Sequence, residues 1–151
     1  MKKIFFNNYF LLASRIILGM IFIFSGAEKI SGPAAFAEAV SNYRMFPLVV
    51  VNLTAVVIPW LELISGLLLV FGIATKENGY IILFLLVIFN ILIFIALARG
   101  LNIDCGCFGT ARAEQIGISK ILENLILTVI GIPLLFREST LFSLNKHDRH
   151  K

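Results

Sequence analysis

The sequence predicts an all-α membrane protein, a bundle of four transmembrane helices with a short interfacial helix between the first two. Of its 151 residues, 59% are hydrophobic, and the mean hydropathy is +0.95. Both values lie well above those of a soluble globular domain. Four apolar runs approach the roughly 20 residues that a helix needs to cross a bilayer. Because backbone groups in hydrocarbon must be paired within their own segment, these unalternating runs indicate helices.

The predicted spans lie near residues 10–30, 48–73, 79–98 and 118–136. They leave no room for a second domain. We therefore expect a single integral membrane domain over residues 1–151, ending in a polar cytoplasmic tail at 138–151.

The segments between the spans also carry local signals. Ser31-Gly32-Pro33 is typical of a helix start, since proline is tolerated in the first turn. Residues 34–45 carry apolar side chains at helical spacing, which predicts a short helix in the membrane interface. Pro47 is expected to end this helix. Lys76-Glu77-Asn78 is predicted to be a tight turn that forces the second and third spans to pack antiparallel.

The net charge of +4 comes from 13 basic and 9 acidic residues, and most of them sit at the ends of segments. This distribution indicates membrane topology and a lipid bilayer as the partner, and argues against nucleic acid. Seven Lys and Arg residues fall on the side of the two termini and five on the other side. The excess of basic residues on the side of the termini predicts that both termini are cytoplasmic in a bacterial inner membrane. The loop between the third and fourth spans would then be extracytoplasmic.

Arg15 and Glu62 are charged residues deep within the first and second predicted spans. Arg15 shares one helix face with Gly19, Phe22, Gly26 and Lys29, so this face should point into the bundle. A charge at mid-membrane needs a partner, and Glu62 of the second span is the expected partner of Arg15. A proton or quinone-contact site and a buried structural ion pair both remain open for these residues.

Further polar and small residues occur inside the spans. Asn90 lies in the third span, and Lys120, Asn124 and Thr128 follow one face of the fourth, where they are expected to form hydrogen bonds between helices. Glycines let helix backbones approach closely, and the expected contacts are Gly19, Gly26, Gly66, Gly72 and Gly131.

The only two cysteines lie in the loop Asp104-Cys105-Gly106-Cys107-Phe108-Gly109, between the third and fourth spans. Two cysteines one residue apart have Cα atoms at most about 7 Å apart, so a disulfide closes only a small, constrained ring. Gly106 eases the bend through its access to positive φ. A strained, exposed disulfide tends to be oxidising and labile. Phe108-Gly109 would let the loop fold back on the membrane.

Arg99 and Arg112 lie on the same side and would stabilise a thiolate, whereas Asp104 opposes it. Three interpretations stay open. The pair is a reactive dithiol that exchanges with a thioredoxin-like extracytoplasmic partner, or it is a static disulfide or two free thiols that shape the loop, or it captures a soft metal such as copper or mercury. A zinc site is not expected, because a closed site needs four ligands and no histidine lies on this side.

Several of these elements together resemble a known family. They are Arg15-Ile16-Ile17-Leu18-Gly19, Ser25-Gly26-Ala27-Glu28-Lys29, Pro59-Trp60-Leu61-Glu62 with Gly66, and Arg99-Gly100 leading into Asp104-Cys105-Gly106-Cys107-Phe108-Gly109. In this order, from Arg15 to about Ile130, the chain resembles the methylamine utilisation protein MauE family, within the DoxX-like four-helix membrane proteins.

The resemblance implies an integral membrane protein whose namesake works beside a thioredoxin-like partner in the maturation of methylamine dehydrogenase, an exported enzyme rich in disulfides. It implies that Cys105 and Cys107 form a redox pair, which would make the chain a thiol-disulfide oxidoreductase. By analogy with DsbB and vitamin K epoxide reductase, which use more cysteines, quinone is the cofactor to consider. The alternatives are a non-catalytic scaffold of a maturation complex and a copper or mercury carrier.

Overall fold

The computed structural model describes residues 8–100 and 118–136, and within the last range the side chains from Ile121 onward. These residues form helices only, which agrees with the predicted all-α class. The helices are α2 (Asn8–Ser31), α3 (Pro33–Asn42), α4 (Leu48–Phe71), α5 (Thr75–Ala98) and α6 (Ile118–Phe136).

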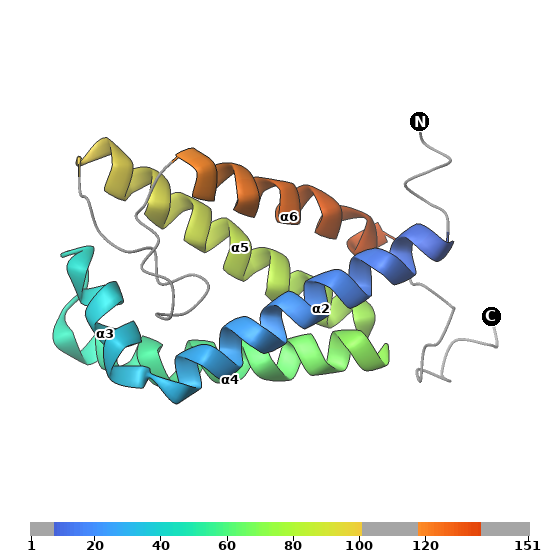
Figure 1. The fold of residues 1–151 in the computed structure, drawn as a ribbon, viewed down its shortest axis with the longest axis horizontal. Helices are drawn as coiled ribbons and strands as arrows, with labels where there is room; N and C mark the ends of the chain where they lie inside the picture. The colour runs from blue at the N-terminus through green and yellow to red at the C-terminus, as the bar shows by residue number, and fades with distance from the viewer. Residues whose placement is uncertain (1–7, 101–117, 137–151) are drawn as a thin grey trace.

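The long helices form two antiparallel pairs, α2 with α4 and α5 with α6 (Figure 1). The end of α2, the start of α4, the end of α5 and the start of α6 lie towards one end of the molecule, together with α3. The start of α2 and the turn between α4 and α5 lie towards the other end. The predicted antiparallel packing of neighbouring helices is therefore confirmed.

Glycines hold α2 and α4 at close range. A Cβ placed on Gly26 would lie 2.7 Å from the Pro59 carbonyl oxygen, and one on Gly66 would lie 2.8 Å from the Gly19 carbonyl oxygen. Because these neighbours are backbone atoms, no side chain can rotate to make room. The predicted close approach at Gly19, Gly26 and Gly66 is confirmed. Gly131 of α6 is also closely packed, but against a side chain, since an added Cβ would lie 2.8 Å from Leu83 Cδ2 of α5.

The turn between α4 and α5 lies earlier than the sequence indicated. Gly72 ends α4 with φ 71° and Ala74 precedes α5 with φ 46°, so Gly72 serves as a helix cap. Lys76-Glu77-Asn78 belongs to the first turns of α5, where the Asn78 amide donates to the carbonyl oxygens of Ile73 and Ala74. These two hydrogen bonds hold the turn in place, and hydropathy alone does not predict them.

Helix α3 begins at Pro33 as predicted, but Asn42 ends it before Pro47 is reached. Pro47 instead precedes the first residue of α4, a position where its fixed φ and missing N–H cost nothing. The side chains of Phe36 and Tyr43 are buried, and α3 packs along α4. The helix therefore extends the bundle beyond the end of α2.

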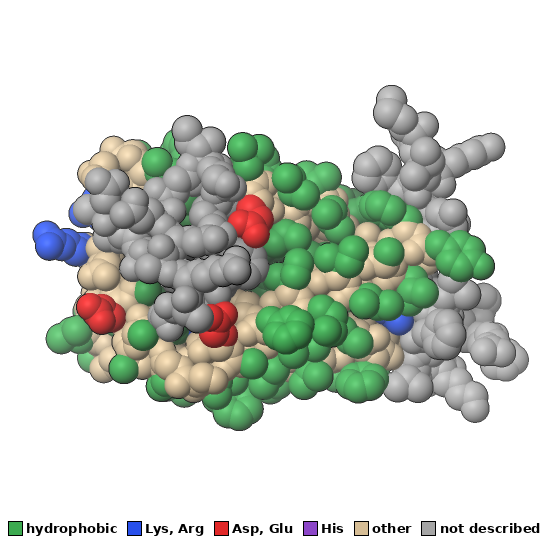
Figure 2. All heavy atoms as spheres, viewed as in Figure 1, with side chains coloured by type: hydrophobic (Ala, Val, Ile, Leu, Met, Phe, Trp, Pro, Cys, Tyr) green, Lys and Arg blue, Asp and Glu red, His purple; other side chains and the backbone are tan. Residues whose placement is uncertain are grey.

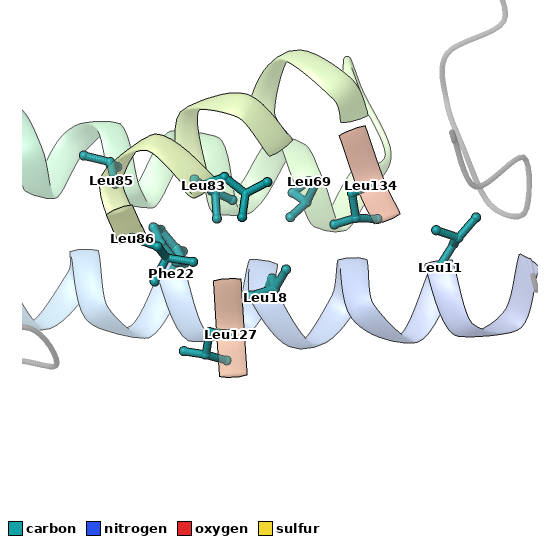
Figure 3. Close-up of a cluster of buried hydrophobic side chains, with 10 residues drawn as sticks. Leu11, Leu18, Phe22, Leu69, Leu83, Leu85, Leu86, Leu127 and Leu134 are labelled. Atoms are coloured by element: carbon teal, nitrogen blue, oxygen red, sulfur yellow. The ribbon is translucent and has the colours of Figure 1, made fainter. Parts of the chain in front are cut away.

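The core between the two pairs is aliphatic except for Phe22. Figure 3 shows its side chains pointing between the helices, and they come from all four long elements. The buried members are Leu11, Leu18, Phe22, Leu69, Ile82, Leu83, Leu85, Leu86, Leu127 and Leu134.

The outer surface is also apolar. Phe84 and Phe94 of α5 are 65% and 66% exposed, and hydrophobic side chains cover the middle of the face drawn in Figure 2. Exposing so many apolar side chains to water would be unfavourable, so this surface is suited to contact with lipid. Helices α2, α4 and α5 are each long and apolar enough to cross a membrane, and the part of α6 whose side chains are described, Ile121–Phe136, is apolar but shorter.

Candidate functional site

A closed polar cluster lies between α2 and α4. The Lys29 ammonium is 2.7 Å from each carboxylate oxygen of Glu62 and donates to the Ser25 hydroxyl at 2.9 Å. The Ser25 hydroxyl donates to Glu62 Oε2 at 3.2 Å. Lys29 is 1% exposed and Glu62 is 2% exposed. The three N–H groups of the ammonium therefore have three oxygens within hydrogen-bond distance.

The local sequence explains how these side chains meet. Ser25 and Lys29 are four residues apart, so they lie on the same face of α2. Gly26 lies between them and lets that face approach Pro59 and Leu63 of α4, next to Glu62. The glycine thus sets the distance between the helices at which an ammonium and a carboxylate form a direct pair.

Aromatic rings close the cluster from two other helices. The Lys29 ammonium lies 5.2 Å from the ring centroid of Phe36 in α3 and 5.1 Å from that of Phe89 in α5. Both distances suit a cation–π contact, which strengthens when water is excluded. Lys29 consequently contacts all of α3, α4 and α5 from its place on α2.

The predicted pair between Arg15 and Glu62 is wrong, since Glu62 pairs with Lys29. Arg15 lies fourteen residues before Lys29, which is about 21 Å along a helix. Gly19 of α2 lies beside Val70 of α4, so Arg15, one turn earlier, is level with the end of α4 and far from Glu62. Arg15, Gly19, Phe22, Gly26 and Lys29 are nevertheless all buried, which confirms that this face points into the bundle.

A second polar group connects α5 and α6. Asn90 Nδ2 donates to the Leu86 carbonyl oxygen at 3.0 Å and lies 3.5 Å from Thr128 Oγ1. The Thr128 hydroxyl donates to the Asn124 carbonyl oxygen at 2.7 Å. The predicted hydrogen bonding between these spans is thus present between Asn90 and Thr128. Asn124 is 2% exposed.

Both groups lie at one level of the bundle, because Phe89 touches Lys29 and the next residue, Asn90, reaches Thr128. We call Ser25, Lys29, Glu62, Asn90, Asn124 and Thr128 the polar layer. The other buried residues of these helices are mostly aliphatic. A buried polar residue in a membrane helix is costly and often functional.

Arg99 links the end of α5 to the end of α3. Its Nη1 donates to the Tyr43 carbonyl oxygen at 3.0 Å, and burial raises the pKa of the Tyr43 phenol to about 12. The predicted site residues of the cysteine loop, Asp104, Cys105, Gly106, Cys107, Phe108, Gly109 and Arg112, lie outside the described residues.

The sequence interpretation missed Lys29 and Ser25 as the partners of Glu62. A signal was present, since Lys29 shares the buried face of α2 with Gly26. Its place near the helix end made it look like an interfacial charge. Helix α3, which covers that end with Phe36, removes it from solvent.

Comparison with known proteins decides the family. The profile of the family described as methylamine utilisation protein MauE matches residues 7–137 of this chain. The chain belongs to the MauE family. The match includes every described helix and the cysteine loop, and a multi-pass membrane protein is what the three apolar helices indicate independently.

Individual relatives agree with this assignment. The MauE-family chain is 28% identical over 123 residues to the methylamine utilization protein MauE of Paracoccus denitrificans, an alignment covering 81% of this chain and 66% of the relative. It is 30% identical over 121 residues to that of Methylorubrum extorquens, covering 78% and 65%. The chain thus spans slightly less than two thirds of the length of these relatives. No solved structure matches it.

Proposed function

We propose that this MauE-family protein crosses a bacterial inner membrane four times and performs thiol–disulfide exchange outside the cytoplasm, with Cys105 and Cys107 as the redox pair. Its partner is a thioredoxin-like extracytoplasmic protein, and the process served is the maturation of exported proteins. The names of the relatives connect them to methylamine utilisation, so a methylamine-oxidising enzyme is the first client to examine.

The observation that supports this proposal is the position of the two helix ends that flank the cysteine segment in the sequence. This segment joins the end of α5 to the start of α6, which lie towards the same end of the molecule as α3 (Figure 1). At this end Arg99 is held against the Tyr43 carbonyl oxygen. A guanidinium near a thiol favours the thiolate, which is the reactive form.

The exchange balances without another reagent. The thiolate of one cysteine attacks a sulfur of the partner's disulfide, so a mixed disulfide forms and one partner thiolate leaves. The second cysteine then attacks the mixed disulfide, which leaves a Cys105–Cys107 disulfide and a reduced partner. Two electrons and two protons pass to the partner, and the reverse reaction returns them.

The fourth span and the topology belong to this proposal. The 19 residues of α6 reach about 28 Å at 1.5 Å per residue, close to the roughly 30 Å of a hydrocarbon core. The excess of basic residues on the side of the termini supports cytoplasmic ends.

The test is alkylation of the cysteines in intact cells with a membrane-impermeant maleimide, before and after mild reduction. We expect labelling only after reduction, and Cys105→Ser or Cys107→Ser should trap a mixed disulfide with a thioredoxin-fold protein. The double serine variant serves as the control that traps nothing. Thiols that never react from outside, or client maturation that is normal in the double variant, would contradict the proposal and favour a scaffold.

A further inference from the structure

Two arginines meet at the end of the molecule where α3 and α5 end. Arg99 Nη1 donates to the Tyr43 carbonyl oxygen at 3.0 Å, and this carbonyl belongs to the peptide that joins Tyr43 to Arg44. The guanidinium of Arg99 therefore lies directly beside the backbone of Arg44. Figure 2 shows basic side chains protruding at the corresponding end of the face that it draws.

The charges of these two arginines are not neutralised within the described residues. Both residues are exposed, and the salt bridge of the described helices joins Lys29 to Glu62 instead. Membrane topology does not explain them either, because basic residues are favoured in cytoplasmic loops and this end is extracytoplasmic in the proposed topology. Arg44 and Arg99 therefore indicate binding to an anionic group of another molecule.

The backbone at Arg44 is strained. Its φ is 51°, in the left-handed region that residues other than glycine seldom adopt. Its N–H donates to the Ser41 carbonyl oxygen at 2.9 Å, and the preceding Tyr43 is buried in one cluster with Ile93 of α5. Packing thus holds Arg44 in an unfavourable conformation, and residues kept under such strain cluster at functional sites. A glycine would form this turn without strain, so the turn alone does not explain an arginine.

Apolar side chains continue the surface beside the arginines. Met45 and Phe46 are exposed, and Leu48 and Val49 are 74% and 78% exposed. Helix α4 has 24 residues, about 36 Å at 1.5 Å per residue, which exceeds the roughly 30 Å of a hydrocarbon core. Its first turn can therefore extend to the membrane surface. Arginine, methionine and aromatic residues together are typical of protein interfaces.

The distance to the cysteine segment indicates which protein covers this surface. Cys105 follows Arg99 by six residues, which span at most about 22 Å when fully extended. A stable interface covers about 800 Å² of each partner, a patch roughly 30 Å across. A protein that reaches Cys105 would therefore also reach Arg99 within one interface.

We propose that Arg44, Arg99 and the exposed apolar residues between positions 45 and 49 form the docking surface for the exported thioredoxin-like partner. The partner contributes carboxylates, which pair with the two guanidinium groups, and an apolar patch that packs against the start of α4. The identity of this partner rests on the proposed function. Docking itself requires neither cysteine.

The experiment measures how purified exported thioredoxin-fold proteins of the host bacterium bind the Cys105→Ser/Cys107→Ser chain in nanodiscs of neutral lipid, at low and high salt. We expect one of them to bind. Arg44→Gln and Arg99→Gln should each weaken its binding about tenfold, the factor that corresponds to roughly 1.4 kcal/mol. Combining them should remove most of the salt dependence of the association rate, because exposed charges steer association and are screened by salt.

Three controls separate docking from folding. Arg44→Gly should bind as weakly as Arg44→Gln without a lower unfolding temperature, since glycine accepts a positive φ. Glu38→Gln, at an exposed position of α3, should not weaken binding, because it removes a charge that repels an acidic partner. Leu48→Ser should weaken binding, whereas Phe71→Ser, at an exposed position of the opposite end of α4, should bind like the parent.

Binding that neither glutamine variant changes would overturn the proposal, as would the absence of any binding partner. So would arginine variants that lose stability in anionic lipid only and still bind the partner, because the arginines would then bind lipid phosphate. Thiol exchange with a partner whose binding does not depend on the arginines would refute the docking surface alone. Arginine-dependent binding without thiol exchange by the parent chain would refute the proposed redox function alone.

Discussion

At the scale of single residues, the pairing of Lys29 with Glu62 is the main electrostatic feature of the described structure. Both side chains are almost fully buried, so neither charge is screened by water. Such a pair repays its desolvation only through good geometry and additional hydrogen bonds. Here Ser25 and two aromatic rings provide them.

Replacing one charged residue of this pair should therefore lower the free energy of unfolding more than replacing both. We expect Lys29→Met to lower the free energy of unfolding by about 3–5 kcal/mol, because it leaves the Glu62 carboxylate buried alone. Combining it with Glu62→Leu should recover most of the loss. Denaturant unfolding in detergent micelles measures this, with the exposed Glu38→Gln as the control. If the double variant is as unstable as Lys29→Met alone, the unpaired Glu62 carboxylate is not the cause of the lost stability.

At the scale of helices, the α2–α4 interface depends on backbone contact at glycines and not on interlocking side chains. Gly19, Gly26 and Gly66 each have a backbone atom of the other helix within 3.0 Å of an added Cβ. Association in lipid depends on such close packing, since apolar burial alone provides no driving force there. The same contacts set the register that brings Lys29 to Glu62.

A single methyl group tests this interface. Gly26→Ala should lower the free energy of unfolding by about 1–3 kcal/mol, because its Cβ would overlap backbone atoms of Pro59 and Leu63. Gly79→Ala is the matched control, since its nearest neighbours are side-chain atoms at 3.7 Å and 3.8 Å. At position 79 the higher helix propensity of alanine should raise the stability of the protein slightly. Equal effects at the two positions, measured by thermal unfolding, would argue against close packing at Gly26.

At the scale of the whole molecule, two helix pairs enclose an aliphatic core that contains one polar layer. The layer connects the pairs through Phe89, which contacts Lys29 while Asn90 reaches Thr128.

The number of spans has a direct consequence for the termini. If α6 crosses the membrane together with the three candidate spans α2, α4 and α5, both ends of the chain lie on the same side, which in the proposed topology is the cytoplasm. Fusions of green fluorescent protein to either end should then fluoresce, whereas alkaline phosphatase fusions should be inactive. A phosphatase that is active at the C-terminus alone would contradict the fourth span.

The sequence by itself determined the helical class, the approximate spans and the buried face of α2, because length, hydropathy and 3.6-residue periodicity are local properties. It also identified Glu62, Asn90 and Asn124 as exceptional residues. Only the tertiary structure decided that Lys29 is the partner of Glu62 and that Asn124 Nδ2 has no hydrogen-bond partner among the described residues. Which residue pairs with Glu62 depends on the axial register between α2 and α4. The contact of Gly26 with Pro59 and Leu63 sets this register. No local sequence pattern encodes it, because the two helices are far apart in the chain.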